Sequence, residues 1–287
     1  MKNLIKAVIV IIVFVFSSSA QAQTKSPKLE NSLLWEISGN GLEKPSYVYG
    51  TIHMICTPDY FLSEKAKKAI NASNKLVLEI NFADPVEATN MQKMAMGKEP
   101  LSKLLKPEQL SKLDGILKST TGMSVQQVDN FSLVTVMSLI SMKTFGCTDL
   151  KLYEMEFIEM AKKRNIVIGG LETVKSQLEV FGDAYSNDEM IDMLGESNPE
   201  ETTKLVAAYK AENVDLLFNL VTDKKFMNEA TRKLMLDGRN SNWVKEIPQM
   251  MKNESVFFAV GSGHLGGEFG VINLLRKAGY IVKPVMN

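Results

Sequence analysis

The sequence predicts an α/β fold with a mixed central sheet, built from the N- and C-terminal segments and carrying a large helical insertion at about 85–250. Apolar and β-branched runs bounded by glycine and proline occur at residues 32–80 and again at 254–285. Between them, apolar residues recur mostly at helical spacing. Neither terminal part has enough strands for a sheet of its own, and no linker divides the chain. We therefore expect one domain over residues 23–287.

The N-terminal part predicts a hairpin followed by a βαβ unit. Residues 32–38 and 46–52 read as strands, with a turn rich in glycine, asparagine and proline between them. Residues 63–73 have helical spacing and begin at Ser63, a residue type that caps helices. The apolar run 75–80 is a buried strand, so a parallel pair with 46–52 is expected.

The rest of the chain is mostly helical before it returns to strands. Five segments have helical periodicity: 107–120, 130–143, 152–165, 198–221 and 228–252. One segment inside this region, 166–172, reads instead as a strand that runs into two glycines. The C-terminal part predicts a strand at 254–263, a helix at 269–279 and a last strand at 280–285.

Composition and the N-terminus bound the class of protein. Lys plus Arg equals Asp plus Glu, at 33 each, which argues against nucleic acid as a partner. Residues 1–22 join a basic start, a short apolar core and Ala20-Gln21-Ala22, the pattern of a cleaved secretory signal. We expect a periplasmic or secreted protein with no stable membrane anchor after cleavage.

The chain has two cysteines, Cys56 and Cys147. In an oxidising compartment two cysteines tend to pair, so a disulfide is expected. Two alternatives stay open. Both cysteines can be free thiols, or Cys56 can ligate a metal together with His53, three residues before it.

The chain also has two histidines, and both stand in the same pattern. His53 follows Gly50 and His264 follows Gly261, each just beyond an apolar run. Sites in open α/β sheets form beyond the carboxyl ends of strands, where glycine lets the backbone approach a ligand. The repeated G-x-x-H pattern favours imidazoles that act as metal ligands or proton carriers. The alternative is that each histidine only satisfies backbone groups at a strand end.

Several polar residues occupy comparable positions. Glu79 lies within the apolar run LVLEI, where a carboxylate needs a partner. Glu172 and Gln177 follow a strand with two glycines, and Arg239 and Asn240 follow another glycine. The sequence has no G-x-S-x-G, H-E-x-x-H, G-x-G-x-x-G or P-loop motif. The glycine-rich GSGHLGGEFG lacks the Lys-Ser/Thr end of a phosphate loop.

The ordered set YGTIHM, LVLEI, GLETVKSQ, GRN and VGSGHLGG resembles the TraB/GumN family over about residues 33–285. The resemblance implies an α/β sheet with a helical insertion, related to the erythromycin-esterase and ChaN-like group. It implies an active centre of His53, Glu79 and His264 on a divalent metal ion of the manganese or cobalt type. Glu172 is a further catalytic candidate, with Gly50, Gln177, Arg239, Asn240 and Gly261 in support.

These observations lead to two functional hypotheses. The first is an exported metal-dependent hydrolase, foremost a peptidase, in which two histidines and a carboxylate leave metal positions open for water and a peptide or small-molecule substrate. The second is an exported protein that binds a ligand such as haem in the same cleft without turnover.

Overall fold

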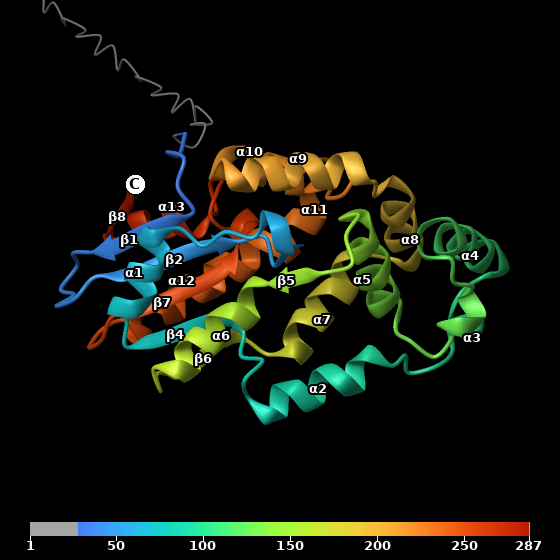
Figure 1. The fold of residues 1–287 in the computed structure, drawn as a ribbon, viewed down its shortest axis with the longest axis horizontal. Coiled ribbons are helices and arrows are strands. Elements are labelled where there is room, and N and C mark those ends of the chain that lie inside the picture. Colours follow the sequence, from blue (N-terminus) through green and yellow to red (C-terminus); the bar gives the residue numbers. More distant parts are fainter. Residues whose placement is uncertain (1–27, 287) are drawn as a thin grey trace, which may run out of the picture.

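The computed structural model describes residues 28–286, so the predicted signal at 1–22 lies outside the described residues. Its centre is a six-stranded sheet in the order β6-β4-β7-β2-β1-β8 (Figure 1). The strands of this sheet are β1 (Leu34–Ser38), β2 (Ser46–Thr51), β4 (Lys75–Ile80), β6 (Val167–Glu172), β7 (Val256–Gly261) and β8 (Ile281–Pro284). The predicted α/β class with a mixed sheet is confirmed.

The sheet is parallel except for one strand. β6, β4, β7 and β2 run parallel to one another, whereas β1 is antiparallel to both β2 and β8. The hairpin of β1 and β2 is as predicted. The predicted pairing of β2 with β4 is wrong, because β7 lies between them. Every residue of β7 is buried, and such a wholly apolar strand belongs at the centre of a sheet.

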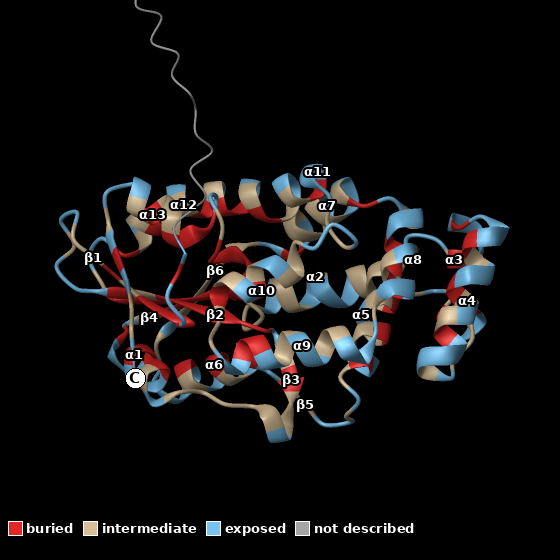
Figure 2. Ribbon diagram, turned by 90° about the horizontal axis from the view of Figure 1, so that it is seen from above, coloured by how far each residue is buried: buried red, intermediate tan, exposed pale blue. Residues whose placement is uncertain are grey.

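Helices cover both faces of the sheet. Successive residues of a strand point to opposite faces, and apolar residues on both faces need cover. Tyr49 and Phe257 belong to the core on one face, whereas Val48 and Phe258 belong to the core on the other. The first face is covered by α1 (Glu64–Ala72), α6 (Tyr153–Lys163), α9 (Pro199–Lys210) and α10 (Val214–Val221). The second face is covered by α12 (Arg239–Met250) and α13 (Val271–Lys277). Figure 2 shows the buried strands between these layers.

The rest of the insertion forms a group of helices that extends from beside the sheet to the far end of the molecule (Figure 1). A separate apolar cluster holds it together, with Leu113, Val136 and Ile191 among its members. Its helices are α2 (Pro85–Ala95), α3 (Leu101–Leu104), α4 (Pro107–Thr121), α5 (Leu133–Thr144), α7 (Val174–Ala184), α8 (Asn187–Glu196) and α11 (Glu229–Arg232). A π-helical segment, Lys233–Gly238, joins α11 to α12. The insertion also supplies β6, so the central sheet is completed from the middle of the chain.

A small second sheet, absent from the sequence predictions, pairs β3 (Met54–Cys56) with β5 (Leu150–Leu152). A disulfide between Cys56 and Cys147 ties the end of β3 to the segment just before β5. The N–H of Tyr153 donates to the carbonyl of His53 at 2.9 Å, which extends the pairing beyond the two strands. This sheet therefore fixes the backbone on the C-terminal side of His53.

No helix within residues 28–286 combines the length and the apolar character needed to cross a bilayer.

Candidate functional site

The candidate site lies where four parallel strands end at one edge of the sheet. Thr51 at the end of β2 pairs in register with Gly261 at the end of β7. Glu172 at the end of β6 pairs with Ile80, the residue after Glu79 in β4. Parallel strands present their carboxyl ends at the same edge, and so these residues meet.

The glycines of the two G-x-x-H motifs make room for each other's motif. A Cβ on Gly261 would lie 2.8 Å from Nε2 of His53 and 3.3 Å from Oε1 of Glu79. A Cβ on Gly50 would lie 2.7 Å from Cδ1 of Leu265 and 3.1 Å from the Cα of Ser262. Each glycine is thus required by the motif on the neighbouring strand.

The other glycines of GSGHLGG are explained by packing against α10. A Cβ on Gly263 would lie 2.8 Å from Val221, and a Cβ on Gly266 or Gly267 would lie 2.9 Å or 2.5 Å from Phe218. Gly267 also has a φ of +81°, which favours glycine. These glycines allow the loop that carries His264 to lie directly against the helix.

Glu79 is the buried acceptor at the centre of the site. Its Oε1 accepts the N–H of Gly261 at 2.6 Å, and its Oε2 accepts from Arg239 at 2.6 Å and from Gln177 at 3.1 Å. Burial alone would raise the pKa of Glu79, but the nearby rings of His264 and His53, the guanidinium of Arg239 and the Gly261 N–H lower it to about 2. The group is therefore a carboxylate at neutral pH.

Arg239 connects the acids to His264. Its Nη2 donates to Glu79, its Nε donates to Glu172 at 3.0 Å, and its Nη1 donates to Nε2 of His264 at 3.1 Å. The guanidinium lies 5.0 Å from the ring of Trp243, whose indole N–H donates to Glu172 at 2.8 Å. Glu172 thus holds Arg239 and Trp243 in place, and two buried carboxylates share one buried guanidinium.

His264 is buried as a neutral ring with a defined tautomer. The amide nitrogen of Asn240 donates to the carbonyls of His264 and Phe269, so the amide oxygen of Asn240 faces Nδ1 of His264 at 2.6 Å as an acceptor. Nδ1 must carry the proton, which leaves a lone pair on Nε2. Burial, helped by the charges of Arg239 and His53 and opposed by Glu79, lowers the pKa of His264 to about 3.

His53 lies on the solvent-exposed side of the site, next to Gly261. Its backbone has a φ of 61°, and its side chain is 54% exposed. Nδ1 lies 2.8 Å from Oε1 of Glu154, which also accepts the hydroxyl of Thr51 at 2.9 Å. The surrounding protein opposes protonation of the half-exposed ring, but the charge and hydrogen bond of Glu154 outweigh this and raise the pKa of His53 to about 9.

Three donor atoms converge beside Gly261. Nε2 of His53 lies next to the Cα of Gly261, Oε1 of Glu79 accepts its N–H, and Nε2 of His264 is 3.9 Å from that same Oε1. Two imidazoles and a carboxylate are a common ligand set for a divalent cation. Both rings have Nδ1 held by an acceptor, as metal-binding histidines usually do.

The donor chemistry fits a cation, but the three groups do not form a ready-made cage. Over residues 28–286, no cluster of three His, Cys, Asp or Glu side chains has the spacing of a metal site. The guanidinium of Arg239 uses the Nε2 lone pair of His264 instead. A cation on that nitrogen and this hydrogen bond exclude each other, because Nε2 has one lone pair.

Comparison with known proteins assigns the chain to a family. The family model described as "TraB/PrgY/gumN family" matches residues 33–284. The chain belongs to the TraB/PrgY/gumN family. Metalloprotease TIKI1 of Xenopus tropicalis is 24% identical over 88% of the chain and 61% of its own length. Metalloproteases TIKI1 and TIKI2 of Danio rerio are each 22% identical, over 91% and 90% of the chain. The chain spans about 61–65% of the length of these three relatives.

Sequence reasoning missed three residues at the site of this TraB/PrgY/gumN member. Trp243 stands one helical turn after Arg239, a spacing that puts both on one face of α12. Thr51 lies between Gly50 and His53, and its hydroxyl role has no sequence signal. Glu154 is in the first turn of α6. Nothing in the sequence indicated that β3 and β5 would pair and bring it to His53.

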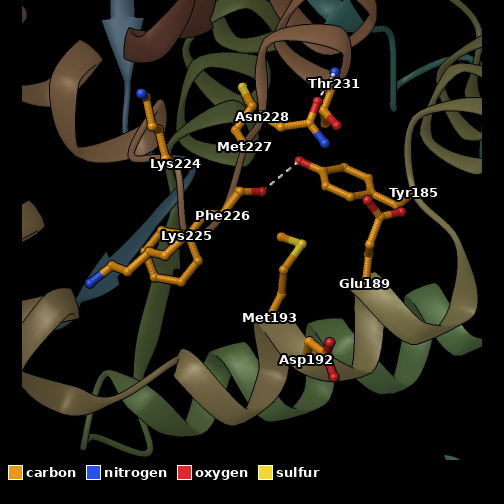
Figure 3. A pocket seen from close by; sticks show the side chains of 10 residues that line it. All are labelled: Tyr185, Glu189, Asp192, Met193, Lys224, Lys225, Phe226, Met227, Asn228 and Thr231. Atoms are coloured by element: carbon orange, nitrogen blue, oxygen red, sulfur yellow. Dashed lines mark hydrogen bonds between the residues drawn. The ribbon is translucent and has the colours of Figure 1, made fainter.

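A separate pocket of about 210 Å³ lies in the insertion, and Figure 3 shows the side chains that line it. It is bounded by α8, by α11 and by the segment between α10 and α11. The hydroxyl of Tyr185 donates across it to the carbonyl of Phe226 at 3.3 Å. None of the predicted site residues lines it. The two histidines and Glu79 therefore define a different place in the fold.

Proposed function

We propose that this chain is a metal-dependent hydrolase of peptides, with a divalent cation held by His53, Glu79 and His264. The observation that carries the proposal is the convergence of the two Nε2 atoms and Oε1 of Glu79 beside Gly261. A cation there would supply Lewis-acid polarisation of a peptide carbonyl and would acidify water. The relatives named as metalloproteases support the reaction class.

The protein groups around these atoms have separate tasks. Glu79 supplies the negative charge, and the Gly261 N–H orients its Oε1. Asn240 and Glu154 hold Nδ1 of each ring, so that Nε2 is the nitrogen left beside Gly261 in His53 and beside Arg239 in His264. If His264 were to bind a cation through Nε2, Nη1 of Arg239 would lose its acceptor there and would be left beside the site. A released guanidinium N–H is suited to donate to an oxygen that gains negative charge during hydrolysis.

We infer a cation of the manganese or cobalt type and a periplasmic or secreted protein. Arg239 is shared by Glu79 and Glu172, which leaves one carboxylate charge at the site without a cation of its own. A further positive charge would balance it, which supports a cation in this place.

The test measures cation binding and peptide cleavage together. Co²⁺ and Mn²⁺ are titrated calorimetrically, and a mixed peptide library is assayed for new termini by mass spectrometry. His53→Ala is the decisive variant, because the exposed ring can be removed without opening a core cavity. We expect it to lose both cation binding and cleavage, whereas Glu156→Gln, two residues from Glu154, should keep both.

Wild-type protein that binds neither cation, or a His53→Ala variant that binds and cleaves as wild type does, would contradict the proposal. His264→Gln serves as the second variant, since the buried ring is not safely truncated to alanine. A Soret band on titration with haem, lost in both variants and without any cleavage, would instead support the ligand-binding alternative.

A further inference from the structure

His53 has an unusual need for support. It lies two residues after the end of β2, its own backbone is left-handed, and its ring is half-exposed. A free imidazole in that position would rotate about two side-chain bonds and exchange its proton between two nitrogens. In the structure the ring nevertheless has one orientation, with Nε2 over Gly261.

The support comes from a closed set of hydrogen bonds around Nδ1. Oε1 of Glu154 lies 2.8 Å from Nδ1 and accepts the Thr51 hydroxyl at 2.9 Å. The hydroxyl oxygen of Thr51 in turn accepts the backbone N–H of His53 at 3.3 Å. Because a carboxylate only accepts, Nδ1 must be the donor, and a neutral ring then carries its lone pair on Nε2.

The fold places Glu154 for this contact. The N–H of Tyr153 donates to the carbonyl of His53, and the hydroxyl of Tyr153 donates to the carbonyl of Phe61 at 2.8 Å. Glu154 follows directly, in the first turn of α6, where the helix dipole favours a carboxylate. Its side chain is only 12% exposed, so it is not one of the solvated surface pairs.

We propose that Glu154 is the positioning residue of His53: it holds a proton on Nδ1 and keeps Nε2 beside Gly261, so that the lone pair of the neutral ring lies there. Without Glu154, the ring can rotate, and its proton can move between Nδ1 and Nε2. The consequence for cation affinity rests on the proposed function, whereas the consequence for the ring itself does not.

The chain allows a clean test, because it has two histidines. Protein made with ¹⁵N-histidine and no histidine tag gives two ring spin systems, which His264→Gln assigns. Spectra are recorded without metal above pH 10, where the rings are neutral. We expect wild-type His53 to be the Nδ1–H tautomer and Glu154→Ala to shift it to a mixture dominated by Nε2–H, with the His264 signals unchanged.

Two further variants separate positioning from general damage. Glu154→Gln keeps an acceptor oxygen and should retain the Nδ1–H tautomer. Glu156→Ala removes an equal charge from the same helix, where it pairs with Lys151, and should leave both rings unchanged. Glu154→Leu replaces the alanine variant if that one does not fold. Cation affinity should fall about 10–100-fold in Glu154→Ala and stay within twofold in Glu156→Ala.

The outcomes distinguish the two proposals. If His53 in Glu154→Ala keeps the wild-type tautomer, or if Glu156→Ala shifts it equally, the positioning role is wrong. If the tautomer shifts as expected and the wild type binds no cation, Glu154 still positions His53 and the proposed function is what fails.

Discussion

Replacing Arg239 by methionine is the sharpest test of the buried charge network. Methionine keeps most of the side-chain volume and its contact with Trp243, but it removes the one guanidinium shared by Glu79 and Glu172. All three side chains are at most 13% exposed. Removing one partner of a buried ion pair costs about 3–5 kcal/mol, because the remaining charge is left uncompensated. The expected fall in Tm is roughly 6–15 °C at neutral pH.

Urea and thermal unfolding followed by circular dichroism measure this loss. The matched control is Arg232→Met, because Arg232 is 37% exposed and contacts a single carboxylate, Asp237, at 3.3 Å. Because more than a third of the Arg232 side chain is exposed to solvent, this pair should contribute only about 1 kcal/mol or less. If Arg239→Met loses no more stability than Arg232→Met, the reasoning about a buried network is refuted.

The same variant also reports on the cation. Without Arg239, Nε2 of His264 has no competing donor, and a divalent cation can replace the missing positive charge. We expect Mn²⁺ or Co²⁺ to bind Arg239→Met more tightly than wild type. A cation at a hundred times its dissociation constant should restore about 2.7 kcal/mol of stability. Equal or weaker binding by the variant would show that Arg239 does not compete with the cation.

Three other changes have specific expected outcomes. In Gly261→Ala the new Cβ would lie 2.8 Å from Nε2 of His53, so the ring must move away and calorimetric cation affinity should fall at least about 10-fold, with little loss of stability. Cys56→Ser with Cys147→Ser opens a cross-link between residues 91 apart, and urea unfolding should show a loss of up to about 4–5 kcal/mol. His264 has a folded pKa of about 3 against 6.5 when unfolded, so the unfolded chain binds the extra proton between these values. Stability should therefore fall as pH drops below 6.5, and unfolding of His264→Gln at pH 7, 5 and 4 should show a flatter decline.

Features of the fold that depend on neighbouring residues could be predicted from the sequence, whereas pairings between distant segments could not. The hairpin of β1 and β2 was predictable, because a Gly-Asn-Gly turn and two apolar runs are local signals. The insertion of β7 between β2 and β4 was not, because periodicity identifies a strand without naming its neighbours. The strands β3 and β5 were missed altogether, because each has only three residues and gives no recognisable periodicity.

The site followed a similar division. The structure brings Glu79, Arg239 and His264 into direct contact, and the sequence singled them out through an acid in an apolar strand, a strand-end glycine before His264 and a glycine before Arg239. Glu154 stood in an amphipathic helix and looked like any surface acid. Its contact with His53 depends on a pairing between distant segments, and no local pattern encodes it.

The interlocked glycines of the two G-x-x-H motifs have a consequence for how such a chain can vary. The spacing of His53 and His264 is set by the hydrogen-bond register of β2 and β7, with Thr51 opposite Gly261. The helices α3, α4 and α8 pack in a core of their own and share no residue with that register. Changes in those helices that keep their own core packed can therefore leave the spacing of the two histidines unchanged, whereas neither glycine can change unless the opposite motif changes with it.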